Sequence, residues 1–193
     1  MQRLDPEKRD AILDAAKQRL RKYGIQKTKM QEIAKDVGIA VGTLYLYFKN
    51  KNEVLIASVE AYGQQHIAYA EEILNSEKSP QEKLKYYIIN RFRITEDINN
   101  SGSHAAELVR AVMKIKPDFV EEQSGWTRKN VLKILREGIE NDLFCLDNLE
   151  RDVEVFLYSI GYFFPFATTK QYYQIEEKDL AMVIDWFIEK WSC

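Results

Sequence analysis

The chain has 193 residues, of which 46% are hydrophobic and 30% charged, and its formal net charge is −2. This balance is typical of a folded globular protein and excludes a disordered chain. The sequence shows no signal peptide and no apolar run of about 18 residues, so we expect a cytoplasmic protein without a membrane segment.

The charge is distributed unevenly along the chain. Residues 1–51 hold 12 Lys or Arg against 6 Asp or Glu, a net charge of +6. Residues 52–193 hold 16 against 24, a net charge of −8. A basic first part on an acidic body suits phosphate binding at one end, although a charged stretch alone is more often a solvated surface.

The residues that enzymes and metal sites need are scarce. Cys145 and Cys193 are far apart in sequence, and we expect both to be reduced thiols. With His66 and His104 they show no compact spacing of metal ligands. There is also no Gly-rich phosphate loop, no nucleophile elbow and no H-E-x-x-H motif. We therefore predict no enzyme, no metal site and no cofactor, although missing motifs alone leave an all-helical enzyme open.

Helical patterns of apolar residues run along almost the whole chain, which predicts an all-α fold with about nine helices. Asp5 and Pro6 form a typical helix start, and Gly24 a typical end. The apolar side of this first helix is expected to be buried; it consists of Ile12, Leu13, Ala16, Leu20 and Tyr23.

Residues 28–51 read TKMQEIAKDVGIAVGTLYLYFKNK and predict two short helices joined at Gly38. We expect Thr28 to cap the first helix in a capping box with Gln31. In the second helix, Val41, Leu44 and Phe48 fall on one side, which must be core. The outward face is then formed by Ile39, Gly42, Thr43 and Leu46, flanked by Tyr45 and Tyr47. Two short helices with a tight turn and a small, apolar outward face describe a helix-turn-helix.

Six further helices are expected after this pair. The first of them begins at Asn50 and runs to about residue 74, with one continuous apolar stripe. The others cover about residues 79–98, 104–115, 118–143 (interrupted near Ser124-Gly125), 147–167 and 176–191.

Residues Ile33 to Lys51 form a sequence motif that closely resembles the TetR family of bacterial repressors: I-A-x-x-x-G-x-x-x-G-T-L-Y-x-Y-F-K-x-K. The resemblance covers about residues 9–55, and the later part of the chain matches only in length and helical character. One departure is clear: Ala40 and Val41 replace a Ser or Thr and a polar or basic residue, so the second helix should start without a side-chain cap.

This resemblance implies a role for particular residues in binding double-stranded operator DNA. Thr28, Tyr45, Tyr47 and Lys51 would hold phosphates, together with Lys49 and the N-terminus of the helix that follows. Gly42 would allow close backbone approach, Thr43 would contact a phosphate or a base, and Leu46 would pack on a thymine methyl group. For Tyr45 and Tyr47, packing in the core is the competing interpretation.

The family also implies a DNA-binding domain at residues 1–50 and a ligand-binding and dimerisation domain at 51–193. The helices at about 147–167 and 176–191 would form the surface of a homodimer. A small, largely apolar effector would then release the repressor, and YLYFKNK resembles members that sense fatty acyl thioesters. Polar and aromatic residues in the apolar stripes could line its pocket: Tyr62, His66, Tyr69, Tyr87, Arg91, His104, Tyr158 and Tyr162.

Simpler interpretations remain for these residues and for the protein. Arg91 could pair with a buried carboxylate such as Glu107, and each His could hydrogen-bond within the core. The protein could also be an architectural DNA-binding protein without an effector, or a metal-sensing regulator.

Overall fold

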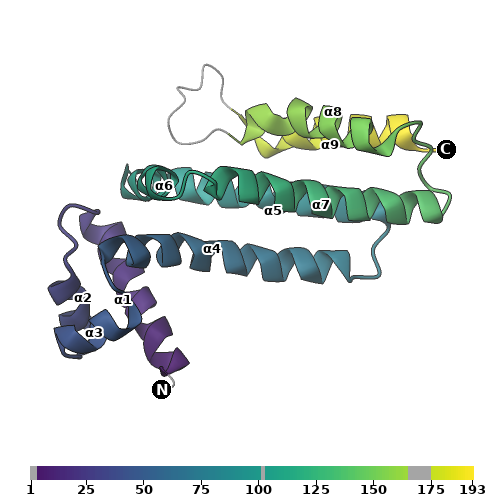
Figure 1. Cartoon of the computed structure of the whole chain (residues 1–193). Coiled ribbons are helices and arrows are strands. Elements are labelled where there is room, and N and C mark those ends of the chain that lie inside the picture. Colours follow the sequence, from purple (N-terminus) through teal and green to yellow (C-terminus); the bar gives the residue numbers. More distant parts are fainter. Residues whose placement is uncertain (1–3, 101–102, 165–174) are drawn as a thin grey trace. The chain divides into compact units, whose positions relative to one another are not determined.

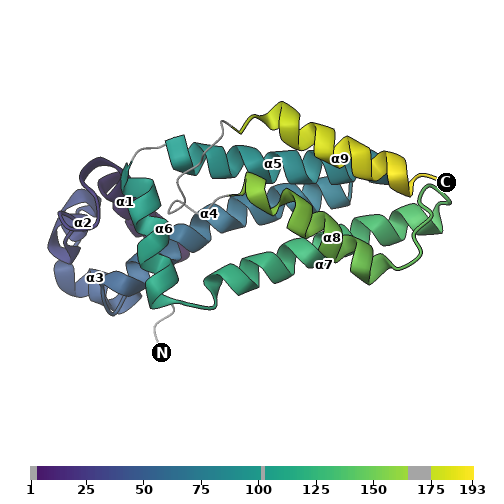
Figure 2. The same cartoon turned by 90° about the horizontal axis from the view of Figure 1, so that it is seen from above.

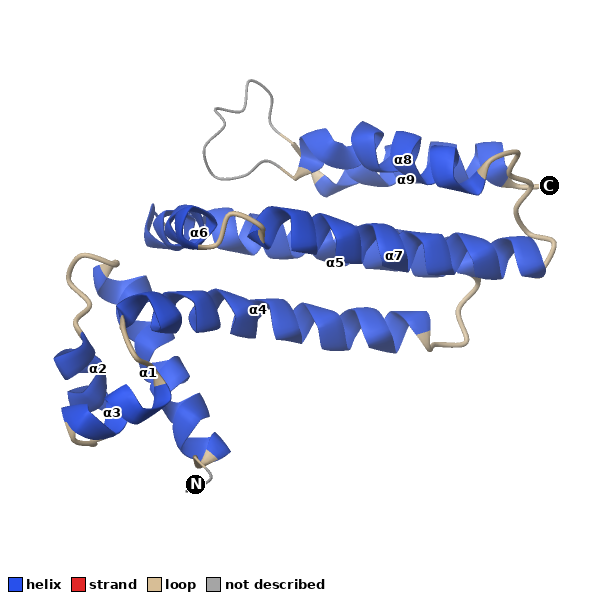
Figure 3. Ribbon diagram, viewed as in Figure 1, coloured by secondary structure: helices blue, strands red, loops and turns tan. Residues whose placement is uncertain are grey.

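The computed structural model describes residues 4–100, 103–164 and 175–193. These residues form nine α-helices and one 3-10 turn, and no β-strand, which confirms the predicted all-α fold (Figures 1 and 3). The helices are α1 Pro6–Tyr23, α2 Met30–Val37, α3 Val41–Tyr47, α4 Lys51–Leu74, α5 Pro80–Asn100, α6 Ser103–Ile115, α7 Phe119–Glu140, α8 Leu149–Ile160, the 3-10 turn η1 Gly161–Phe163, and α9 Glu177–Trp191.

Two of the expected helix boundaries are wrong. Helix α7 is continuous through Ser124 and Gly125, because the helix buries Thr127, Asn130 and Val131 just beyond them and packing outweighs weak local propensity. Helix α8 ends at Ile160 rather than near residue 167, since the chain tightens into η1 at Gly161. Residues 165–167 lie outside the described part of the chain.

Packing divides the chain into two compact units. Unit 1 comprises residues 1–65 and 98–119, and unit 2 comprises residues 66–97 and 120–193. Helix α4 contributes to both. The functional boundary near residue 50 differs from this division and stays a prediction.

Unit 1 contains two neighbouring apolar clusters. The first joins α1, α2, α3 and the start of α4 through Ile12, Leu13, Ala16, Met30, Ile33, Ala34, Leu44, Phe48, Val54 and Ala57. The second joins α1, α4 and α6 through Leu20, Leu55, Val59, Leu108 and Val112. Figure 2 shows α6 beside α1 and the first half of α4. Helix α6 is therefore packed as part of the same unit as the helix-turn-helix.

Unit 2 is built on the apolar faces of α5, α7, α8 and α9 and the end of α4. Within it, α8 and α9 form one layer over α5 and α7 (Figure 1). Ion pairs join the layers at the surface: Arg93 to Glu177 at 2.6 Å and Lys85 to Asp185 at 2.7 Å link α5 to α9, and Arg128 to Glu154 at 2.5 Å links α7 to α8. Phe156, Phe187 and Trp191 pack ring against ring between α8 and α9.

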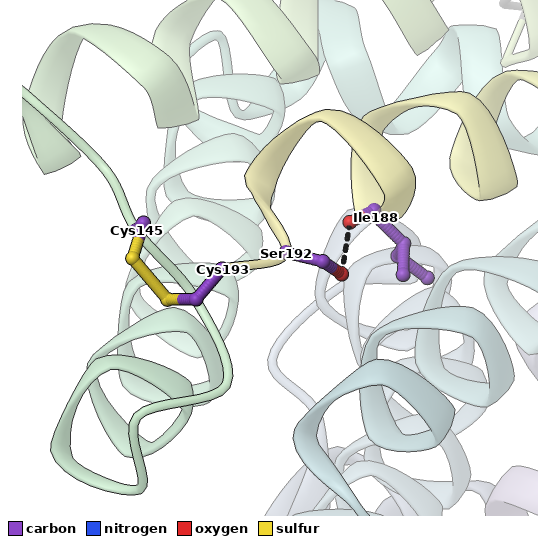
Figure 4. Close-up of a disulfide and its surroundings, with 4 residues drawn as sticks. All are labelled: Cys145, Ile188, Ser192 and Cys193. Atoms are coloured by element: carbon purple, nitrogen blue, oxygen red, sulfur yellow. Dashed lines mark hydrogen bonds between the residues drawn. A yellow bond between two sulfur atoms is a disulfide. The ribbon is translucent and has the colours of Figure 1, made fainter.

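The expectation of two free thiols is wrong. Cys145 and Cys193 form a disulfide that joins the loop between α7 and α8 to the segment after α9 (Figure 4). Their separation of 48 residues gave no sign of proximity in the sequence. The fold brings them together because Phe144 and Ser192 pair in a short antiparallel bridge next to them.

Among the described helices, none is both long enough and apolar enough to cross a membrane.

Candidate nucleic-acid interface

The turn between α2 and α3 has the form that the sequence predicts. Gly38 ends α2 in the left-handed conformation, with φ of 73°, where a glycine is favoured. Helix α3 then begins at Val41, after Ala40, without a side-chain cap. The departure of Ala40 from the family pattern therefore has the expected local consequence.

Thr28 does not form the predicted capping box. Helix α2 begins one residue later than expected, with Lys29 at the N-cap position and no side-chain cap. Thr28 is instead 1% exposed, and its hydroxyl donates to the carbonyl oxygen of Gly24 at 2.8 Å. In this conformation it positions the turn between α1 and α2 and is not available as an exposed phosphate contact.

Helix α3 presents a small, apolar and aromatic surface, which we call the α3 face: Gly42, Thr43, Tyr45 and Leu46. Leu46 is 68% exposed and Tyr45 44% exposed, while Leu44, which precedes them, is fully buried. Gly42 has no neighbouring atom where a Cβ would stand. Leu46 and Tyr45 thus place apolar surface on the solvent side of a helix whose other side is anchored in the core, and an apolar side chain there suits contact with a base methyl group.

Tyr47 and the start of α4 border the α3 face. Tyr47 is half-buried and its hydroxyl accepts a hydrogen bond from the Asp5 backbone at 3.3 Å. Asn50 accepts from the Glu53 backbone at 3.0 Å, and Glu53 accepts from the Lys49 backbone at 2.8 Å, so the start of α4 is capped in both directions. The side chain of Lys49 stays exposed.

Lys51 differs from Lys49 in its surroundings. Its ammonium donates to the carbonyl oxygen of Ile25, in the turn between α1 and α2. Burial lowers the pKa of Lys51 below its ordinary value, and the nearby Glu107 carboxylate opposes that shift. In this conformation Lys51 holds the α1–α2 turn, and its predicted phosphate contact stays a prediction.

Helix α6 touches the same turn at Gly24. A Cβ on Gly24 would stand 2.6 Å from Nδ1 of His104 and 3.3 Å from Oε2 of Glu107, so a side chain there would require both residues to shift. Gly24 also has φ of 73°. His104 Nδ1 and Glu107 Oε2 lie 3.4 Å apart. His104 is thus in unit 1, in contact with the turn that precedes the helix-turn-helix, whereas Tyr69, Tyr87 and Arg91 belong to unit 2.

An arginine that the sequence did not single out fixes α2 to α1. Arg19 binds Asp36 through two hydrogen bonds, of 2.7 and 2.9 Å, and also binds Glu32. The bonds from Arg19 lower the pKa of Asp36 below its ordinary value. The available signal was the spacing of Glu32 and Asp36, which at i and i+4 lie on one side of a helix and can face one cation.

The predicted effector-binding residues are divided between the two units. Tyr87 is buried in unit 2, where its hydroxyl accepts from Asn130 at 3.3 Å and its ring packs on Trp126. The guanidinium of Arg91 lies 5.8 Å from the ring centre of Phe164 and forms no ion pair with the described residues of its own unit. Tyr69 is half-buried against the same core. The side chains of Tyr62 and His66 lie outside what the structure describes.

Tyr158 and Tyr162 lie on an exposed surface rather than in the core. Tyr158 is 80% exposed. The exposed apolar side chains of α8, η1 and α9 are Val155, Tyr158, Tyr162, Met182 and Trp186, and we call this set the α8–α9 surface. The opposite side of α8 is buried, with Val153, Phe156 and Ile160 in the core. The side of α8 opposite to the core is therefore apolar and exposed, and the exposed Tyr158 and Tyr162 do not line an enclosed pocket within the described part of unit 2.

Comparison with known proteins identifies the helix-turn-helix. A family model described as bacterial regulatory proteins of the tetR family matches residues 12–58, which span most of α1 to the first third of α4. The fatty acid metabolism regulator protein of Bacillus subtilis is 33% identical over 132 residues, covering 67% of each chain. The transcriptional repressor KstR2 of Mycolicibacterium smegmatis is 26% identical over 141 residues, covering 72% of this chain and 69% of the repressor.

The fold extends this similarity to the whole chain. The crystal structure of a transcriptional regulator from Cytophaga hutchinsonii superposes with a TM-score of 0.75 at 23% identity, covering 95% of this chain and 98% of that one. At 23% identity, the similarity to the Cytophaga hutchinsonii structure shows the fold alone. Taken with the match over residues 12–58 and the identity to the Bacillus subtilis regulator, it shows that the chain belongs to the TetR family of transcriptional regulators.

Proposed function

We propose that this protein is a cytoplasmic repressor that binds a palindromic operator as a homodimer and is released by a small, largely apolar effector. The observation that carries the proposal is the α3 face. Gly42, Tyr45 and Leu46 are exposed on a helix whose Leu44 is fully buried, so the face is rigidly presented and has no partner within unit 1 among the described residues. A rigid helix of this width fits the major groove of DNA.

Several other groups support binding to the DNA backbone. Lys49 is exposed directly before α4, and the N-terminus of α4 adds backbone N–H groups with a positive dipole end. The first 51 residues carry the net positive charge of the chain. These groups supply the electrostatic attraction that does not depend on sequence, and the α3 face supplies the base contacts.

The α8–α9 surface supports a homodimer. Tyr158, Met182 and Trp186 are large and exposed, while the opposite sides of their helices are buried in the core of unit 2. Several large apolar residues exposed on two helices of one layer are what an interaction site offers. A second copy of the chain is the fitting partner, because one helix-turn-helix reads only one half of a palindrome.

The effector is proposed to bind within unit 2, at Arg91 and the neighbouring aromatic residues. Arg91 is half-buried with its guanidinium over Phe164, and Phe92 packs edge-on against the same ring at 6.5 Å. An arginine beside aromatic rings suits an apolar molecule with an anionic group. The name of the Bacillus subtilis relative, a regulator of fatty acid metabolism, supports an effector of this chemistry.

Release of DNA requires the effector to favour a conformation with lower operator affinity. Helix α4 is one continuous helix with residues in both units, and it begins beside the α3 face at Lys51. We propose that α4 transmits the effect of effector binding in unit 2 to the α3 face. A coupling free energy of about 1–3 kcal/mol would weaken operator binding roughly 5- to 150-fold, and the operator would weaken effector binding by the same factor.

The test combines three measurements on the full chain. Light scattering should give the mass of a dimer, and footprinting on upstream DNA should give a symmetric site. A thermal-shift screen of apolar and amphipathic anionic metabolites should find compounds that also lower operator affinity. A monomer with no footprint would refute the proposal. A symmetric footprint that no stabilising compound alters would favour an architectural protein without an effector.

A substitution on the α8–α9 surface tests the dimer separately. Tyr158→Asp should raise the dimer dissociation constant at least 10-fold, because a carboxylate would be buried in an apolar interface. Lys178→Asp is the control, since Lys178 is exposed at the start of α9 and outside the apolar set. Equal dissociation constants for both variants would place the interface elsewhere.

A further inference from the structure

The disulfide joins the loop before α8 to the segment after α9. Cys145 and Cys193 are both exposed, and their Cα atoms are 5.1 Å apart. Figure 4 shows the bond between the loop after α7 and the segment after α9, beside the hydrogen bond from Ser192 to Ile188. The exposed position of both residues suits exchange with a small thiol.

The bond reinforces a contact that holds two helices. The Cys145 backbone N–H donates to the Trp191 carbonyl oxygen at 2.7 Å, and Phe144 pairs with Ser192. The ring of Trp191 packs against Phe144 at 6.3 Å and against Phe156 of α8 at 5.5 Å. The disulfide thus ties the end of α9 to the loop from which α8 starts, and so fixes the two helices that carry the α8–α9 surface.

We propose that the Cys145–Cys193 pair is a reversible thiol–disulfide site that controls dimer formation through the α8–α9 surface. This inference rests on the proposed function, because a regulator that binds operator DNA acts in a compartment where thiols are kept reduced. Disulfides of proteins in that compartment are usually transient and serve catalysis or redox sensing. An exposed bond that fastens a dimerisation surface suits the second of these roles.

The chemistry is an exchange with a thiol and its disulfide. A thiolate attacks one sulfur of the Cys145–Cys193 bond, forms a mixed disulfide with it and releases the other cysteine as a thiolate. A second thiolate then attacks the mixed disulfide, which leaves two protein thiols and one small-molecule disulfide. Two thiols are oxidised and one protein disulfide is reduced, so electrons balance, and the reverse reaction closes the bond with a small-molecule disulfide as oxidant.

Opening the bond should loosen the last turn of α9. The Cys145 hydrogen bond and the Trp191 ring contacts then hold it without a covalent tie. Trp186 of the α8–α9 surface lies five residues before Trp191, which is less than two turns of the same helix. The expected result is a dimer dissociation constant at least 5-fold higher for the reduced protein than for the oxidised protein.

The experiment compares the full chain in both redox states with the Cys145→Ser/Cys193→Ser double variant. Oxidised and reduced glutathione set the state, and thiol alkylation with mass analysis reports it. Sedimentation gives the dimer constant. We expect reduced protein and double variant to share the weaker constant, and the double variant to ignore the thiol ratio. Alkylation of cells before lysis should find the pair reduced in unstressed cells and bonded after treatment with a thiol oxidant.

Two outcomes would overturn the proposal. A bond that persists at every thiol ratio, and in unstressed cells, would be a permanent structural disulfide. Equal dimer constants in both states would separate the bond from the α8–α9 surface. Operator titration distinguishes these failures from failure of the proposed function: absence of operator binding in both states refutes the repressor, whereas the alkylation and sedimentation results do not depend on DNA.

Discussion

The ammonium of Lys51, the first residue of α4, donates to the carbonyl oxygen of Ile25, which lies between α1 and α2. Two segments that flank the helix-turn-helix on either side are thereby joined by one side chain. The same carbonyl accepts the Thr28 backbone N–H at 3.2 Å. Lys51 therefore contributes to the position of α2 as well as to the positive charge beside the α3 face.

This contact leads to different expectations for two neighbouring lysines. Lys51→Ala should weaken operator binding by about 10-fold, because its ammonium holds the α1–α2 turn. If that is its whole role, the salt slope, which is the change of log affinity with log salt concentration, should stay unchanged. Lys49→Ala, the matched control, removes an exposed cation and should reduce the salt slope by about one unit. Operator titrations between low and moderate salt measure both slopes. A slope that falls by one unit in the Lys51 variant would instead assign Lys51 to a phosphate.

Leu44 and Leu46 provide a pair of equal side chains in opposite surroundings. Leu46→Ala should change the free energy of unfolding by less than about 0.5 kcal/mol, since Leu46 is exposed, and should relax base preference at one operator position by about 1 kcal/mol. Leu44→Ala should lower the free energy of unfolding by about 2–5 kcal/mol because it empties a buried site. Denaturant unfolding and selection from randomised operators measure the two effects. An unaltered selected sequence for the Leu46 variant would remove Leu46 from the base contacts.

Acid should weaken the contact between α1 and α2. Arg19 lowers the pKa of Asp36 below its ordinary value, so the native state binds fewer protons than the unfolded state as the pH falls. The stabilisation is therefore complete above about pH 4 and is lost as the pH falls through the lowered pKa. Asp36→Asn should cost no more than about 1 kcal/mol at pH 7, since the pair is partly exposed, and less at pH 3. Urea unfolding at the two pH values tests this, and an equal cost at both would exclude the charge of Asp36 as the cause.

Arg91 and Arg93 lie on the same helix and should differ in their effect on effector response. Arg91→Ala should abolish the response to anionic effectors while operator affinity stays within about 2-fold, because Arg91 faces Phe164 in unit 2. Arg93→Ala is the control, as Arg93 is exposed and paired with Glu177. Operator titration with and without the effector measures both. Loss of operator binding in the Arg91 variant would make this arginine a structural residue.

Reduction of the disulfide should lower stability even at protein concentrations where the oligomeric state is constant. Closing a loop across 48 residues stabilises the folded state by about 4 kcal/mol in the chain-entropy treatment. Denaturant unfolding of reduced and oxidised protein measures the difference, and the double Cys→Ser variant should match the reduced form. A difference below about 1 kcal/mol would indicate that the unfolded chain keeps this region together without the bond.

The sequence was sufficient to predict those features that depend on residues close together in the chain. Asp5, Gly24 and Gly38 fix helix ends through cap chemistry that depends on near neighbours, and all three were predicted. The α3 face followed from helical spacing around a buried Leu44. Contacts between distant segments carried no such signal. The partners of Lys51 and Cys145 are set by how helices pack, so neither the engaged lysine nor the disulfide could be read from spacing. Thr28 has a near partner, the Gly24 carbonyl, but its burial depends on the same packing.

Gly24 couples the turn between α1 and α2 to α6. Its φ of 73° is unfavourable for any residue with a side chain, and a Cβ there would require the ring of His104 to shift. A substitution at Gly24 would therefore disturb two places at once: the turn that leads into the helix-turn-helix and the start of α6 that packs on it.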